Sequence, residues 1–227
     1  MATPLLLGHR GARKYAPENT IAAFELALAD GCDGFEFDVR VTADRQAVVC
    51  HDPKYKGLEI ARSTFTQLYE RCGSDDELAL LDSTLRIFQS RAFLNLELKT
   101  SGGEELVLAA LKEFPTKKEI IVSSFWPEVV KRFRELDAAF PLGLICENRR
   151  QLAKWKDLSI QALMLQSGLV NRKLMDEVRA TTSHKSPRIF VWTVNDAREM
   201  KNFAEMDVDG IISDDTKLLV KTLRPES

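Results

Sequence analysis

The 227-residue sequence predicts a (β/α)₈ barrel, or TIM barrel, and two observations lead to this fold class. First, short apolar runs typical of buried parallel strands alternate about eight times with stretches typical of helices. Second, polar side chains stand where several apolar runs end, as expected when the carboxyl ends of barrel strands converge on one mouth. A doubly wound open sheet is the rival fold, but such sheets usually have fewer strands.

The N-terminal segment predicts one strand followed by one helix. The apolar run at 4–7 is typical of a buried strand, and it ends in the polar sequence Gly-His-Arg. A loop then leads to a helix that reaches about Asp30. Asn19 or Glu18 can serve as its N-cap, and Gly31 should end it.

The next segment predicts a second strand and an irregular excursion. Residues 34–40 are typical of a buried strand, and residues 47–51 of its continuation or of an added strand near the same mouth. Residues 53–82 show less regular patterning, with one helical turn expected at 66–71. We interpret them as a short insertion that covers the site as a lid.

From residue 83 onward, predicted helices and strands alternate regularly. The strands are expected at 93–99, 120–125, 142–146, 162–166, 189–194 and 210–213. The helices are expected at 83–90, 103–114, 127–138, 149–158, 172–183, 196–206 and 216–223. Pro127 stands in a first turn, where proline is favoured. No linker divides the chain, so we expect a single domain over residues 1–227.

The composition is that of an ordinary globular protein, with 44% hydrophobic and 29% charged residues. A formal net charge of -2 argues against a general nucleic-acid surface. Four scattered cysteines lack metal-binding spacing and indicate reduced thiols. We see no signal peptide and no apolar run of membrane-spanning length, and therefore expect a cytoplasmic protein. The oligomeric state stays open.

Three carboxylates form a candidate metal site. Glu36 and Asp38 alternate along one strand and so point to the same face, where two like charges need a cation or a proton between them. A solvated edge-strand pair is the alternative, but the flanking residues are apolar. Glu97 could simply form a structural ion pair with Lys99. It becomes a stronger candidate metal ligand because its strand lies next to that of Glu36. Oxygen ligands suit Mg²⁺ and Ca²⁺ equally well.

The histidines are candidates for proton transfer. His9 ends the first predicted strand, although a single histidine there is more often structural. His51 is the stronger candidate because the carboxylate of Asp52 beside it can orient the imidazole, or can instead cap the loop. His184 lies late in a predicted helix among Ser, Thr and Lys, and we assign it to the solvent. With the nearby cations, this set suits the cleavage of a phosphate ester.

These residues together resemble the glycerophosphodiester phosphodiesterase family over almost the whole chain. The matching motifs are GHRG at 8–11, PENT at 17–20, EFDV at 36–39, VVCHD at 48–52, LNLELK at 94–99, VSSF at 122–125, VWTVN at 191–195 and DGIISD at 209–214. The segment 53–82 departs from the family pattern: it is short and carries only Ala-Arg-Ser-Thr at 61–64. The preference for the alcohol is therefore not set by the resemblance.

The resemblance implies a role for each matching position. It makes His9 and His51 general acid and base, Glu36, Asp38 and Glu97 metal ligands, Arg10 and Lys99 phosphate-neutralising groups, and Phe125 and Trp192 walls of the pocket near the glycerol. From the residues alone, the two aromatic side chains are more simply core or pocket wall.

The implied activity is the metal-dependent hydrolysis of a small glycerophosphodiester to sn-glycerol 3-phosphate and an alcohol, a step in lipid and glycerol metabolism. One alternative is an enzyme of the lysophospholipase D type, or a phosphodiesterase that stops at a cyclic phosphate, on the same barrel. A second alternative is a barrel that binds glycerol phosphate without cleaving it. Two histidines and three carboxylates in one set argue against the second.

Overall fold

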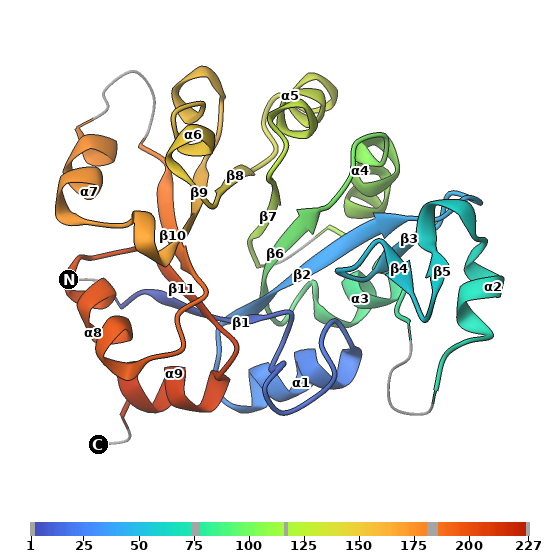
Figure 1. The fold of residues 1–227 in the computed structure, drawn as a ribbon, viewed down its shortest axis with the longest axis horizontal. Coiled ribbons are helices and arrows are strands. Elements are labelled where there is room, and N and C mark those ends of the chain that lie inside the picture. Colours follow the sequence, from blue (N-terminus) through green and yellow to red (C-terminus); the bar gives the residue numbers. More distant parts are fainter. Residues whose placement is uncertain (1–2, 74–77, 116–117, 181–185, 226–227) are drawn as a thin grey trace.

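A computed structural model, which describes residues 3–73, 78–115, 118–180 and 186–225, shows a closed barrel of eight parallel strands (Figure 1). The barrel strands are β1 (Leu5–His9), β2 (Gly34–Val41), β6 (Phe93–Leu98), β7 (Ile120–Ser124), β8 (Leu142–Cys146), β9 (Ala162–Gln166), β10 (Arg188–Trp192) and β11 (Gly210–Ser213). Each strand pairs with the next of this series, and β11 and β2 both pair with β1, which closes the barrel. The predicted fold class is confirmed.

Helices follow the strands and cover the outside of the barrel (Figure 1). They are α1 (Ile21–Ala29), α3 (Leu81–Phe88), α4 (Glu104–Glu113), α5 (Pro127–Leu136), α6 (Arg149–Leu152), α7 (Arg172–Arg179), α8 (Ala197–Glu205) and α9 (Thr216–Leu223). The helix predicted over 149–158 is instead split into α6 and a 3₁₀ turn, η2 (Trp155–Asp157). The last residues of the helix predicted at 172–183, and His184, lie outside the described residues. Within those residues, no helix combines the length and apolar content that a membrane span needs.

The start of α1 corrects one prediction. Its N-cap is Thr20, whose hydroxyl accepts a hydrogen bond from the backbone N–H of Ala23 at 3.1 Å. Neither expected residue caps this helix: Asn19 adopts a left-handed backbone with φ of 59°, and Glu18 pairs with Arg10. Thr20 has the extended backbone that an N-cap needs, whereas Asn19 does not, and the side chains of Asn19 and Glu18 make other contacts.

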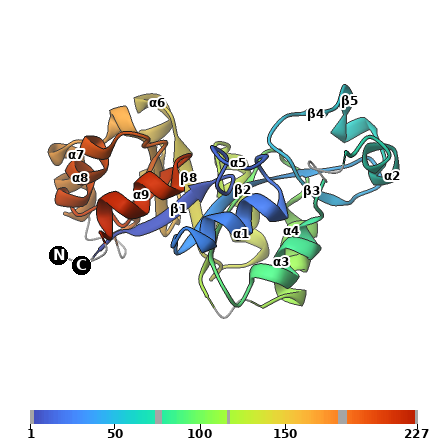
Figure 2. The same ribbon diagram turned by 90° about the horizontal axis from the view of Figure 1, so that it is seen from below.

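The segment after β2 is more regular than the sequence suggests. β3 (Ala47–Val49) is an added strand, antiparallel to β2. Beyond it lie a hairpin of β4 (Lys54–Tyr55) and β5 (Leu58–Glu59) and a 3₁₀ turn η1 (Ile60–Arg62). The helical turn expected at 66–71 is present as α2 (Phe65–Tyr69), with slightly earlier bounds. A small apolar cluster that includes Val48, Ile60, Leu68 and Leu78 holds this excursion together. Figure 2 shows it at one end of the molecule, away from the helices α6 to α9.

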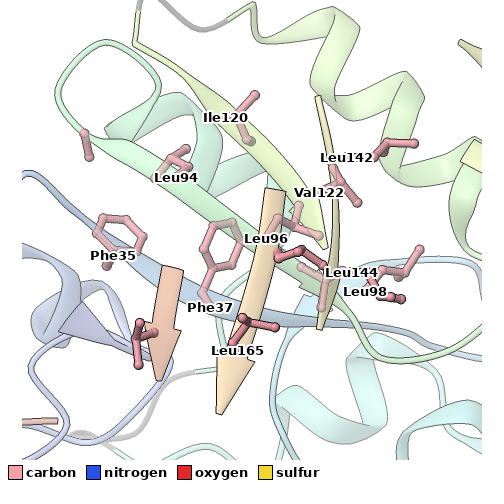
Figure 3. Close-up of a cluster of buried hydrophobic side chains, with 14 of the residues drawn as sticks. Phe35, Phe37, Leu94, Leu96, Leu98, Ile120, Val122, Leu142, Leu144 and Leu165 are labelled. Atoms are coloured by element: carbon pink, nitrogen blue, oxygen red, sulfur yellow. The ribbon is translucent and has the colours of Figure 1, made fainter. Parts of the chain in front are cut away.

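The barrel strands separate two apolar layers by their alternation. Phe35 and Phe37 on β2 face outward, toward the covering helices. They belong to one buried cluster with outward-facing residues of β6, β7 and β8: Leu94, Leu96, Leu98, Ile120, Val122, Leu142 and Leu144 (Figure 3). A second, smaller cluster that includes Phe93, Met164 and Phe190 fills the barrel interior. Each large apolar side chain buried in this way contributes about 1.5–3 kcal/mol relative to its exposure. The alternation leaves the other residues of each strand facing the barrel axis, and that set contains the site.

Candidate active site

The inward-facing residues at the carboxyl ends of the strands converge on one pocket with a volume of about 210 Å³. It is lined by His9, Arg10, Glu36, His51, Asn95, Glu97, Lys99, Phe125, Ile145, Glu147, Met164, Trp192 and Ile212. Of the nine site residues predicted from the sequence, eight line this pocket. The ninth, Asp38, is buried beside it and contacts Lys99 and Arg10. The structure thus brings the whole predicted set together.

Glu36, Asp38 and Glu97 form a buried carboxylate cluster. One oxygen from each lies within 4.8 Å of the others, and the three residues are only 5%, 1% and 7% exposed. The register of β2 and β6, which places Asp38 opposite Glu97, accounts for their proximity. Such close like charges in a buried place oppose full ionisation.

The pKa values of the three carboxyl groups in this cluster shift in different directions. Burial, followed by the charges of Asp38 and Glu97, raises the pKa of Glu36 well above its ordinary value. Burial and the charge of Asp38 raise the pKa of Glu97 to about 7. Burial also opposes ionisation of Asp38, but the charges of Lys99 and Arg10 outweigh it, and the pKa of Asp38 lies below its usual range. Positive charge within the protein therefore stabilises one carboxylate of the three.

Two cations flank the cluster. The ammonium of Lys99 lies 2.7 Å from Glu97 Oε1 and 3.2 Å from Asp38 Oδ1. Arg10 donates its backbone N–H to Glu36 Oε2 at 3.0 Å, and its guanidinium Nε lies 3.3 Å from Asp38 Oδ2. Both cations also line the pocket, so they can face a bound anion while they hold the carboxylates in place.

His9 is held by a residue from the far end of the chain. Its Nδ1 lies 2.7 Å from Oδ1 of Asp214, which directly follows β11, and Asn195 donates to the other oxygen of Asp214 at 2.7 Å. The Nε2 of His9 faces the carboxylate cluster, 3.9 Å from Glu36 Oε2. This arrangement fixes the ring and leaves Nε2 on the pocket side, as proton transfer to a bound molecule requires.

His51 follows β3 and lies on the side of the pocket where the excursion begins. Its side chain is 33% exposed and so is more accessible than that of His9. Its Nδ1 lies 2.8 Å from Oδ1 of Asp52, and its backbone carbonyl accepts two hydrogen bonds from Arg40, at 2.8 and 2.6 Å. Partial burial lowers the pKa of His51 below its ordinary value, despite the opposing charge of Asp38. The neutral imidazole is therefore favoured at neutral pH.

Aromatic side chains form the opposite wall. The rings of Phe125 and Trp192 meet edge to face with centroids 5.7 Å apart, and the ammonium of Lys99 lies 5.8 Å from the Phe125 centroid. The indole Nε1 of Trp192 is buried without a hydrogen-bond partner among the described residues. The pocket thus has a charged half on β1, β2 and β6 and a mainly apolar half on β7 to β11.

Sequence reasoning missed two supporting residues. The amide of Asn19 donates to Asp38 Oδ2 at 2.8 Å and accepts from the Asp38 backbone N–H at 3.1 Å. Asp214 orients His9, as described above. Both positions belong to motifs that the sequence analysis quotes, PENT and DGIISD. Asp214 directly follows the last predicted strand, but a single acidic residue at such a position does not indicate a function by itself.

The donor set fits a hard divalent cation. Three buried carboxylates lie close together, and burial together with the charges of neighbouring carboxylates raises the pKa values of Glu36 and Glu97. Oxygen-only ligands are those that Mg²⁺ and Ca²⁺ prefer, and both ions can occupy such a site. A cluster of acidic residues that could hold a metal is thus present, while its geometry does not choose between the two ions.

The fold and this pocket define the chain as a barrel enzyme of the phosphodiesterase class. The sequence matches the model of the glycerophosphoryl diester phosphodiesterase family over residues 9–85 and 91–218, and the chain belongs to this family. A glycerophosphodiester phosphodiesterase of Caldanaerobacter subterraneus is 27% identical over 244 residues, which cover 97% of this chain and 98% of that protein.

Solved structures share the same barrel. A glycerophosphodiester phosphodiesterase from Parabacteroides distasonis has a TM-score of 0.83 and 26% identity, with 97% of both chains covered. A phosphodiesterase from Oleispira antarctica, solved in complex with the product sn-glycerol-3-phosphate, has a TM-score of 0.85 and 21% identity, with 97% of this chain and 96% of that chain covered. These likenesses agree with the closed barrel seen here.

Proposed function

We propose that this protein hydrolyses glycerophosphodiesters to sn-glycerol 3-phosphate and an alcohol, and that the reaction depends on one divalent metal ion, Mg²⁺ or Ca²⁺. The observation that carries the proposal is the convergence of three carboxylates, two cations and two carboxylate-supported histidines at one pocket. The family and the names of its relatives support the substrate class. The product bound in the Oleispira antarctica phosphodiesterase is the one proposed for this chain.

The charged half of the pocket would bind the phosphate. Glu36, Asp38 and Glu97 would hold the ion, which when bound acts as a Lewis acid that stabilises negative charge on the phosphoryl oxygens. Arg10 and Lys99 would donate to the same oxygens, because both line the pocket and carry charge at neutral pH. Their contacts with the buried carboxylates keep them in place before substrate arrives.

Each histidine would move one proton. His9 presents Nε2 to the pocket because Asp214 holds its Nδ1, and Asp52 supports His51 in the same way. One imidazole would remove a proton from the attacking hydroxyl, and the other would protonate the leaving alkoxide. Attack by this hydroxyl would form a cyclic phosphate. Water would open that cyclic phosphate in a second step, in which the two histidines would exchange roles.

The attacking group is proposed to be the 2-hydroxyl of the substrate's glycerol. Among the described residues, the lining of the pocket contains no serine, threonine or cysteine. Burial raises the pKa of the nearby Cys50 thiol to about 11, so little thiolate is present at neutral pH. Ser123 and Ser124 are buried and donate to Asn95 and to the Leu98 carbonyl. A covalent enzyme intermediate is therefore disfavoured.

Three broader features belong to the same proposal. We propose one domain over residues 1–227, with 53–82 as an insertion that covers the mouth, since this segment begins immediately beyond His51. We propose a cytoplasmic location, which the four free thiols support. The product would enter lipid and glycerol metabolism.

The test is a substrate panel measured with and without chelator. Purified protein is incubated with glycerophosphocholine, glycerophosphoethanolamine and lysophosphatidylcholine, and the release of sn-glycerol 3-phosphate and alcohol is followed. We expect cleavage of the two glycerophosphodiesters and its loss in excess chelator. Binding of sn-glycerol 3-phosphate without cleavage of any diester would instead favour the phosphate-binding alternative. Preferential cleavage of lysophosphatidylcholine would favour the lysophospholipase D alternative.

A further inference from the structure

Glu147 presents a carboxylate to the pocket from the half opposite the proposed phosphate-binding groups. It directly follows β8 and has the same strand parity as Ile145, which faces the barrel interior, and both residues line the pocket. Its backbone is fixed: the Glu147 N–H donates to Gln151 Oε1 at 2.8 Å, and Asn148 caps α6 in a reciprocal capping box with Gln151. The side chain therefore starts from a defined position at the mouth.

The carboxylate of Glu147 has no cationic partner in the described part of the chain. Within the described residues it makes no ion pair and receives no hydrogen bond, whereas Glu36 accepts the backbone N–H of Arg10 and Glu97 lies 2.7 Å from Lys99. It is exposed, and so stays solvated until a ligand arrives. A free carboxylate of this kind accepts hydrogen bonds from hydroxyl groups, and such charge-assisted bonds are stronger than neutral ones.

The surroundings of Glu147 set the shape of the molecule that it can contact. The neighbouring lining is apolar or aromatic and consists of Phe125, Ile145, Met164, Trp192 and Ile212. Such walls suit a short carbon chain, with the carboxylate as the polar group that fixes its orientation. β8 lies four strands from β1 around the barrel, so Glu147 stands across the mouth from His9.

We infer that Glu147 is a specificity-determining residue that accepts a hydrogen bond from the terminal hydroxyl of the glycerol moiety. The inference rests on the proposed function, which places the phosphate near Arg10 and Lys99. The terminal hydroxyl is the glycerol oxygen farthest from phosphorus along the chain, so it is the one that reaches across the mouth. A fatty acyl ester at this oxygen has no proton to donate and leaves the carboxylate unsatisfied. Glu147 thereby selects free glycerophosphodiesters over lysophospholipids.

The test pairs a protein variant with a substrate that lacks one group. Glycerophosphocholine is compared with 2-hydroxypropyl phosphocholine, which keeps the 2-hydroxyl and carries a methyl group in place of the terminal hydroxymethyl. The wild-type protein should prefer glycerophosphocholine by about 10- to 100-fold in kcat/KM, the usual effect of a hydrogen bond to a charged group. Glu147→Leu should lose this preference through a raised KM for glycerophosphocholine, and Glu147→Gln should fall between the two.

A matched control is Glu128→Leu. This substitution removes another exposed carboxylate, in the first turn of α5, that does not line the pocket. It should keep the preference of the wild-type protein. If Glu147→Leu lowers kcat/KM equally for both substrates, the inference is wrong. A loss confined to the choline ester, and absent for glycerophosphoglycerol, whose head group is uncharged, would place the head group at Glu147 and would also overturn the inference.

Failure of the proposed function has a different signature. If the wild-type protein cleaves no phosphodiester, that proposal fails, and calorimetric binding of sn-glycerol 3-phosphate and 2-hydroxypropyl phosphate then decides the inference alone. Tighter binding of sn-glycerol 3-phosphate to the wild-type protein, with equal binding of both to Glu147→Leu, supports the contact. Equal binding of both ligands to the wild-type protein contradicts it.

Discussion

The Nδ1 of His9 lies 2.7 Å from the carboxylate of Asp214, although the two residues are 205 positions apart in the chain. The contact crosses the seam where β1 and β11 pair, so it depends on closure of the barrel. It orients the ring with Nε2 toward the pocket, and Asn195 in turn holds the carboxylate. In the proposed mechanism, Asp214 would act on a bound molecule through His9, as a positioning residue.

Asp214→Asn should lower kcat by roughly 10² while KM changes little, because the amide cannot replace the carboxylate that holds the Nδ1 of His9 and keeps Nε2 turned toward the pocket. His9→Ala should lose at least as much, and the double variant should be no slower than His9→Ala alone. Steady-state kinetics on glycerophosphocholine measure all three, with thermal melting as the check on folding. Additive losses in the double variant would show that Asp214 acts independently of His9.

Metal removal should abolish turnover and leave the fold intact, because the barrel core does not depend on the carboxylate cluster. Glu36→Gln should resemble the chelated enzyme in activity. Circular dichroism and activity, measured before and after dialysis against chelator, provide the comparison. Full activity in the chelated protein would exclude the metal proposal.

The same cluster should make stabilisation by metal depend on pH. The pKa of Glu97 is raised to about 7 in the folded metal-free protein, so its contribution to stability is fully present below its unfolded pKa of about 4.5 and is lost as pH rises through 7. Glu36, whose pKa burial also raises well above its ordinary value, acts in the same direction. The metal-free protein should therefore become less stable between pH 5 and 8. The gain in Tm on adding Mg²⁺ or Ca²⁺ should grow over this range, and a constant gain would contradict the expectation.

The dependence of kcat/KM on pH should be bell-shaped, with one histidine acting as base and the other as acid. Burial lowers the pKa of His51, which keeps it neutral at pH 7 and suits it to the base role in the first step. The acid limb should then fall below about pH 6.5, the ordinary pKa of histidine, and should disappear in His51→Ala. Each histidine variant should lose roughly 10² in rate. An acid limb that persists unchanged in His51→Ala would assign it to another group.

The alternation of inward and outward residues explains why so much of this arrangement could be predicted. Each barrel strand had an apolar signature in the sequence, and the residues of one parity at its carboxyl end necessarily face the mouth. Glu36, Asp38, Glu97 and Lys99 follow directly from that rule. Asp214 follows it as well and was missed because a single acidic residue after a strand carries no signal by itself.

The remaining features depend on contacts that no local pattern encodes. Asn19 reaches Asp38 because its left-handed backbone turns the loop after β1 toward β2, a conformation that the sequence favours only weakly. Arg40 supports His51 through a backbone carbonyl, which any residue could supply. The excursion was predicted as irregular because strands of two residues, such as β4 and β5, are too short to show alternation.

The last prediction concerns the nucleophile. A substrate whose glycerol 2-hydroxyl is replaced by hydrogen should bind with similar affinity and remain uncleaved. The physical reason is proximity: a hydroxyl one carbon from the ester carbon is already held close to phosphorus, and such tethering lowers the barrier substantially. In the proposed mechanism a histidine would act as the base for that hydroxyl, and the described lining of the pocket offers no serine, threonine or cysteine as a competing nucleophile.

Two measurements decide between this route and direct attack by water. In the first, product release from the 2-deoxy analogue is compared with that from the parent diester, with competitive inhibition by the analogue as proof that it binds. In the second, the five-membered cyclic glycerol phosphate is offered as a substrate. An inert but inhibitory analogue, together with hydrolysis of the cyclic phosphate, supports attack by the 2-hydroxyl, since both steps would then use the same two histidines in exchanged roles. Cleavage of the analogue at nearly the parent rate would mean that water attacks phosphorus directly and that the 2-hydroxyl contributes only to binding.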